Sequence, residues 1–188
     1  MEKKIVTAYA QINARIMPIA RGKLFEGPLE EALQANGFGE VGGGGTLQSK
    51  SGEIVYCGID VDLFDLENGV PFVCKFLADR LAPKGSKLCY RVGEEKIEVP
   101  FGEAEGVAVY LNGTELPAEV YKSSDINVVI DTFNRLLGNR VAYKGYWRGP
   151  TETALYIYGR SAARIREAIA PFLAEYPLCQ RARVEQIA

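Results

Sequence analysis

The sequence predicts an α+β fold, and three observations support this prediction. Segments that alternate apolar and polar residues, typical of half-buried strands, recur along the chain, and helical segments with an apolar stripe separate them. The order strand–helix–strand–strand–helix–strand occurs twice. Each half is therefore expected to form a ferredoxin-like βαββαβ unit, with an antiparallel sheet and both helices on one face. The other face of each sheet would be open, and function should be sought there.

The first unit is expected over residues 1–92. Val6, Ala8, Ala10 and Ile12 alternate with polar neighbours, which indicates a strand, and Asn36-Gly37 is typical of a helix end. In order, the expected elements are a strand (4–14), a helix (27–37), a hairpin (38–63), a helix within residues 67–85 that has Pro71 at a first helical position, and a strand (87–92).

The second unit is expected over residues 106–188, after a linker at 93–105. The segment KIEVPF within that linker could instead add a strand. Apolar residues recur at helical spacing between Ile126 and Leu137, and Ser161 is a suitable helix cap. The expected elements are a strand (106–111), a helix (124–139), a hairpin (140–159), a helix (161–177) and a strand (179–187).

Composition excludes several functional classes. The chain of 188 residues has 47% hydrophobic and 24% charged residues and a net charge of −2, which is the balance of a globular protein without general affinity for nucleic acid. No segment approaches the ~20 apolar residues of a membrane span. The N-terminal segment lacks the unbroken apolar stretch of a signal peptide, so we expect a cytoplasmic protein.

The sequence contains no histidine and four scattered cysteines without a CxxC pair. Histidine is the commonest general base near neutral pH and the commonest zinc ligand. We therefore expect free buried thiols, no metal, no cofactor and no catalytic residue.

An acidic stretch at residues 57–69 contains Asp60, Asp62, Asp65 and Glu67. Spacing for a calcium-binding loop is absent, because Phe64, Asp65 and Pro71 occupy its fifth, sixth and twelfth positions. Successive side chains of a strand point to opposite faces of the sheet. The odd-numbered apolar residues from Val55 to Leu63 should therefore face the helices, and Tyr56, Asp60 and Asp62 should lie on the open face. We expect either a solvated face or a surface for a basic partner there.

Two further segments are candidates for function. The run Gly42–Gly45 leads into another strand and lacks a following lysine, so it indicates a bulged edge strand more than a phosphate loop. In the hairpin at 140–159, Tyr156 and Tyr158 should face outward. Either Tyr143, Gly145 and Trp147 or Lys144, Tyr146 and Arg148 would join them. These aromatic residues could pack internally, form a protein interface or stack on single-stranded RNA; the RNP signatures of RNA-binding sheets are absent.

The tandem βαββαβ plan, the acidic patch from Asp60 to Glu67, the glycine-rich segment GFGEVGGGGT and the lack of catalytic residues together resemble the small bacterial immunity proteins that neutralise interbacterial toxins. The resemblance implies a cytoplasmic, non-enzymatic protein that binds and inhibits a cognate toxin. Our expected partner-binding surface combines acidic and aromatic residues, which are Tyr56, Asp60, Asp62, Asp65, Glu67, Tyr146, Trp147, Arg148, Tyr156 and Tyr158.

Three other functions remain open from the sequence. Paired units could enclose a small molecule between them, in a pocket lined by Trp147 and tyrosines, as in a sensor or regulatory protein. An enzyme without histidine would use Asp60, Tyr56 or Cys57, although Cys57 should point away from the other two. An RNA-binding protein would use the aromatic sheet face. The sequence does not define the oligomeric state.

Overall fold

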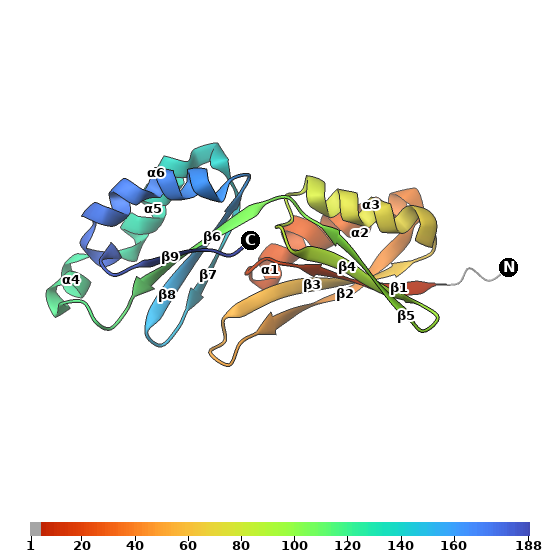
Figure 1. Cartoon of the computed structure of the whole chain (residues 1–188), viewed down its shortest axis with the longest axis horizontal. Helices are drawn as coiled ribbons and strands as arrows, with labels where there is room; N and C mark the ends of the chain where they lie inside the picture. Colours follow the sequence, from red (N-terminus) through yellow and green to blue (C-terminus); the bar gives the residue numbers. More distant parts are fainter. Residues whose placement is uncertain (1–4) are drawn as a thin grey trace. The chain divides into compact units, whose positions relative to one another are not determined.

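The computed structural model describes residues 5–188, which form two compact units. The first unit comprises the chain up to residue 49 together with 54–104, and the second comprises 50–53 and 105–188. Both are α+β, each with one antiparallel sheet and its helices on one face, which confirms the predicted fold class (Figure 1). Within the described residues, no helix is long and apolar enough to cross a membrane.

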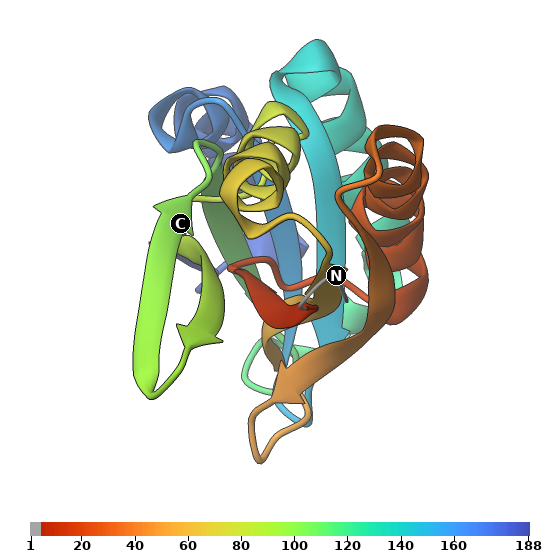
Figure 2. The same ribbon diagram turned by 90° about the vertical axis from the view of Figure 1, so that its right-hand side faces the viewer.

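The first unit has a five-stranded sheet in the order β2-β3-β1-β4-β5, which is the ferredoxin-like order extended by β5. Figure 2 shows β5 and β2 at the two edges of this sheet, with the helices on one side of it. The elements are β1 (Val6–Ile12), α1 (Pro18–Arg21), the π-helical turn η1 (Gly22–Glu26), α2 (Gly27–Asn36), β2 (Gly39–Gln48), β3 (Ile54–Leu63), α3 (Leu66–Asp79), β4 (Ser86–Val92) and β5 (Glu95–Phe101).

Most of residues 93–105, expected as a linker, form the strand β5, which pairs with β4 from Glu95 to Phe101, so the alternative that KIEVPF adds a strand is confirmed. Pro100 has no N–H to donate and is tolerated here because β5 is an edge strand. Apart from the turn at 50–53, the second unit comprises residues 105–188, whereas 106–188 was expected. Helix α3 also differs from expectation, because it begins at Leu66 and contains Pro71 in its interior.

The second unit has a four-stranded sheet in the order β7-β8-β6-β9. Its elements are β6 (Glu105–Asn112), α4 (Ala118–Ser123), α5 (Ile126–Leu137), the 3₁₀ turn η2 (Gly138–Arg140), β7 (Val141–Arg148), β8 (Glu152–Gly159), α6 (Ala162–Glu175), the 3₁₀ turn η3 (Pro177–Cys179) and β9 (Arg183–Gln186). The helix α4 was not predicted from the sequence, since it carries no buried residue and thus no apolar stripe.

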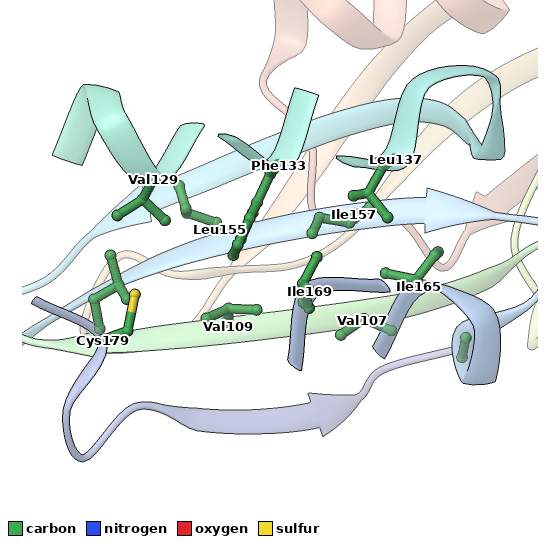
Figure 3. Close-up of a cluster of buried hydrophobic side chains, with 12 residues drawn as sticks. Val107, Val109, Val129, Phe133, Leu137, Leu155, Ile157, Ile165, Ile169 and Cys179 are labelled. Atoms are coloured by element: carbon green, nitrogen blue, oxygen red, sulfur yellow. The ribbon is translucent and has the colours of Figure 1, made fainter. Parts of the chain in front are cut away.

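The core of each unit lies between its sheet and its helices. In the first unit Cys57, Ile59, Val61 and Leu63 on β3 are fully buried, as the alternation predicted. In the second unit Val129, Phe133 and Leu137 on α5 face Leu155 and Ile157 on β8 (Figure 3). Burial of such apolar area, at about 25 cal/mol per Å², is the main source of stability for both units.

Candidate functional site

The acidic stretch does not form one cluster. Asp60 and Asp62 lie on the face of the first sheet opposite the helices, because their partners on β1 are Tyr9 and Thr7. Asp60 is exposed, and Asp62 accepts a hydrogen bond of 2.6 Å from Thr7 Oγ1. Tyr56 also lies on this face and is half-buried, in agreement with the predicted alternation.

Asp65 and Glu67 belong instead to the start of α3. Asp65 is the N-cap residue, and its Oδ1 accepts a hydrogen bond of 3.0 Å from the Asn68 backbone N–H. Glu67 is exposed in the first turn, where a negative charge interacts favourably with the helix dipole. Both carboxylates thus have structural roles. No group of three or more potential metal ligands occurs among residues 5–188.

The alternation on β3 fails at its first residues. Leu47 pairs with Tyr56 and Gln48 with Ile54, so Val55 is an extra residue in a bulge. Val55 is 41% exposed, whereas it was expected to face the helices, and Ile54 is buried. The extra residue in a bulge reverses the faces to which the preceding side chains of the strand point. This explains why Ile54 and not Val55 faces the helices.

The glycine run has a packing role on the helix-facing side of β2. Arg21 is buried and donates through Nε to Glu26 Oε1 at 2.9 Å and through Nη1 to the Gly45 carbonyl and Thr46 Oγ1. A Cβ atom on Gly44 would lie 1.8 Å from Glu26 Oε1. Gly44 therefore leaves room for an ion pair, and Gly42 is an extra residue in a second bulge.

The aromatic hairpin divides its side chains between two faces. Tyr143 pairs with Tyr158, and Gly145 with Tyr156, so these side chains share the face opposite the helices. Tyr156 and Tyr158 are buried, at 1% and 0% exposure. Tyr158 stacks on Tyr143 with 4.8 Å between ring centroids. Their rings are therefore not available to stack on RNA or to contact a partner.

The hydroxyl group of Tyr156 forms a hydrogen bond that helps to hold this side chain in place. It donates to Glu53 Oε1 at 2.6 Å, and Tyr110 donates to the same oxygen at 2.8 Å. Glu53 belongs to the turn at residues 50–53, which is grouped with the second unit. The Tyr110 and Tyr156 rings also meet edge to face, with centroids 6.4 Å apart.

The remaining hairpin residues of the expected surface are also separated. Trp147 lies on the same face as Tyr156 and packs on the hairpin turn, since a Cβ on Gly149 would lie 2.1 Å from its ring. Tyr146 and Arg148 lie on the helix-facing side, opposite Leu155 and Thr153. The residues expected to bind a partner thus do not form a single surface.

A cavity of about 720 Å³ lies in the second unit, between α4 and α5 on one side and the strands β6, β8 and β7 on the other. The sheet contributes Leu155 and Ile157, and α5 contributes Ile126, Ile130 and Phe133. Further lining residues are Leu111, Asn112, Gly113, Tyr121, Ser124, Asn134, Lys144, Gly145, Tyr146, Arg148, Thr153, Tyr156 and Leu178. Most of the wall is apolar, and its polar groups gather near β7 and α4.

The cavity opens to solvent along β7. Lys144, Tyr146 and Arg148 alternate along this strand, line the cavity and are exposed, as is Asn134 on α5. Lys144 Nζ donates to Asn134 Oδ1. Within residues 5–188, no aspartate or glutamate lines the cavity.

The end of the cavity near α4 is held by Tyr121. Its hydroxyl accepts a hydrogen bond of 3.0 Å from the Leu116 backbone N–H and donates to the Asn112 carbonyl at 3.3 Å. These bonds fasten α4 to the end of β6. Tyr121 was not identified as a site residue from the sequence because α4 was not predicted, and Ser124 and Ile126 were assigned to the expected helix at 124–139 without a role in a site.

The groups considered for an enzyme do not converge. Cys57 is fully buried on the helix-facing side of β3, whereas Tyr56 and Asp60 lie on the other side. Burial is the main cause that raises the pKa of the Cys57 thiol to about 12; the charge of Arg21 opposes this shift and that of Glu26 favours it. The thiolate that nucleophilic chemistry needs is therefore scarce at neutral pH.

Comparisons with known proteins give no family. No protein-family model and no curated protein sequence matches the chain. Among solved structures, a mutant of chlorite dismutase from Candidatus Nitrospira defluvii is 12% identical, with 99% of this chain and 91% of the other covered and a TM-score of 0.32. The first two RRM domains of the yeast poly(U)-binding protein Pub1 are 10% identical, with 97% and 99% covered and a TM-score of 0.29. At these values neither likeness bears on function.

Proposed function

We propose that this protein is a non-catalytic binding protein that holds a small molecule in the cavity of its second unit. The cavity itself is the observation that carries the proposal. Its volume of about 720 Å³ falls within the range of about 300–1,000 Å³ that is usual for ligand sites. Its wall combines a mostly apolar surface with a few polar groups near β7 and α4, which is the composition of such sites.

The sequence also suggested a small-molecule sensor, with a pocket between the two units lined by Trp147. In the proposal the site lies within the second unit, and Trp147 packs on Gly149 outside its lining.

The cysteines Cys57, Cys74, Cys89 and Cys179 are free thiols, which is consistent with the reducing cytoplasm as the compartment.

Binding of the neutral, apolar fluorophore N-phenyl-1-naphthylamine to the full chain tests this function. Ile130→Trp places an indole against the cavity and should abolish the fluorescence gain. Val128→Trp is the matched control, because Val128 is on the same helix, is 43% exposed and does not line the cavity. Equal binding by both variants, each shown to be folded by circular dichroism, would refute the proposal.

A second candidate is the immunity protein suggested by the sequence. Glu40 pairs with Asp62, and Asp60 lies two residues before Asp62 on the same face, so three carboxylates gather on the first sheet. Such a surface would attract a basic toxin and accelerate its capture. The test is titration of the full chain with the product of a toxin-like gene, should one lie next to its own. Asp60→Lys should slow association about tenfold or more, and no binding at micromolar concentration would exclude this candidate.

A further inference from the structure

We infer that the cavity selects an amphipathic anion, with an apolar body against α5 and an acidic headgroup on Arg148. This inference rests on the proposed binding function and specifies its ligand class. Two cations, Lys144 and Arg148, line the cavity beside an apolar wall that includes Ile126, Ile130 and Phe133. Because no carboxylate lines it in the described part of the chain, the charge that a ligand meets there is positive.

The cavity cations have no carboxylate partner among the described residues. Lys144 donates only to the neutral amide of Asn134, and Arg148 forms no hydrogen bond or ion pair within residues 5–188. By contrast, Lys122 pairs with Glu119 at 3.1 Å and Arg183 with Glu152 at 3.0 Å in the same unit. The positive charge at the cavity is therefore available to a ligand.

The position of these cations favours contact with a bound headgroup. Lys144 and Arg148 are paired with Ile157 and Thr153, so both side chains are on the cavity side of the edge strand β7. Their Cα atoms are separated by roughly 13 Å, at about 3.3 Å per residue of strand. Tyr146 lies between them on the same face of the strand.

Arg148 is the better receptor of the two. Its guanidinium has no partner to give up, and its planar N–H groups can bind a carboxylate or a phosphate in bidentate fashion. Lys144 would first have to leave Asn134. Thr153, which faces Arg148 across the strand pair and also lines the cavity, offers a hydroxyl donor to the same headgroup.

Displacement of N-phenyl-1-naphthylamine by three ligands of equal chain length tests the inference. Decanoate, decyl phosphate and decanol share the apolar body and differ in the headgroup. The anions should bind the full chain about tenfold more tightly than decanol, and the stronger of the two defines the headgroup. Arg148→Gln should weaken the anions about three- to tenfold, Lys144→Gln less, and neither should affect decanol. Arg148→Lys should restore part of the loss.

Arg166→Gln is the matched control, because it removes the same charge from an exposed position of α6 outside the cavity. The inference would be overturned if decanol and both anions bind with equal affinity and Arg148→Gln does not change it. If Ile130→Trp abolishes fluorophore binding in the same experiments, the proposed function still holds. If Ile130→Trp binds the fluorophore as the wild type does, the proposed function fails and the inference fails with it.

Discussion

Replacing Gly44 with alanine should destabilise the first unit, because a buried ion pair occupies the space of the added methyl group. The new Cβ would lie 1.8 Å from Glu26 Oε1 and 2.8 Å from Arg21 Nη2. Neither Gly44 nor Gly45 has a positive φ, so alanine meets no backbone penalty at either position. The effect of the substitution is therefore the displacement of Glu26 from Arg21.

The size of this effect follows from the contacts of Arg21. It would keep the Gly45 carbonyl and Thr46 Oγ1 as acceptors and lose its charged partner. Separating a fully buried pair costs about 3–5 kcal/mol, and a hydrogen bond to a charged group contributes about 1.5–3 kcal/mol. Because the Glu26 side chain is 21% exposed and can regain water, we expect the lower range, about 2 kcal/mol. The thermal midpoint should fall by roughly 4–8 °C.

Urea unfolding followed by circular dichroism measures the loss, with Gly45→Ala as the control. A Cβ on Gly45 would meet nothing within 4 Å, so this variant should stay within about 0.5 kcal/mol of the wild type. Glu26→Ala adds a double-mutant cycle, since it removes the group that the methyl displaces. In that background Gly44→Ala should cost less than half as much. Equal losses for the two alanine variants, or an unchanged loss without Glu26, would refute the reasoning.

Two other predictions concern α3 and the thiols. Asp65→Ala should cost about 1 kcal/mol of unfolding free energy, because its carboxylate caps α3, whereas Glu67→Ala in the same turn should cost less; equal losses in urea would contradict the capping role. In the folded protein Cys57, Cys74 and Cys179 should react slowly with a disulfide reagent at pH 8, because burial raises the pKa of Cys57 to about 12 and those of Cys74 and Cys179 to about 11. All four should react rapidly in urea, and rapid labelling of Cys57 in the folded chain, detected by mass spectrometry, would contradict the predicted protection.

The fold could be predicted because most of its elements bury one face. On β3, the alternation of Cys57, Ile59 and Val61 with Asp60 and Asp62 matches the observed sides of the strand. Elements that bury little were harder to predict. Ile97, Val99 and Phe101 of β5 alternate with exposed residues but are only half-buried, so the sequence left open both a linker and a strand there. The helix α4 has no buried residue and no apolar stripe, so it was not predicted.

The acidic surface was less predictable, because neighbours in sequence have different structural roles. Asp62 is on a strand, and three residues later Asp65 caps a helix, so their carboxylates serve separate elements. An aspartate directly before a helical segment is a cap signal, but the helix was expected to begin near Pro71. The error in the start of α3 therefore became an error in the proposed surface.

The cavity depends on a feature that no simple alternation contains, namely a bulge in β7. Val141 pairs with Gly159 and Tyr143 with Tyr158, so Ala142 is an extra residue. Val141 packs on the helix-facing core, and a regular strand would direct Tyr143 to the same side. The bulge instead turns Tyr143 to the opposite face and brings Lys144, Tyr146 and Arg148 to the cavity. The sequence left both arrangements open, and this one extra residue gives an apolar cavity its positive charge.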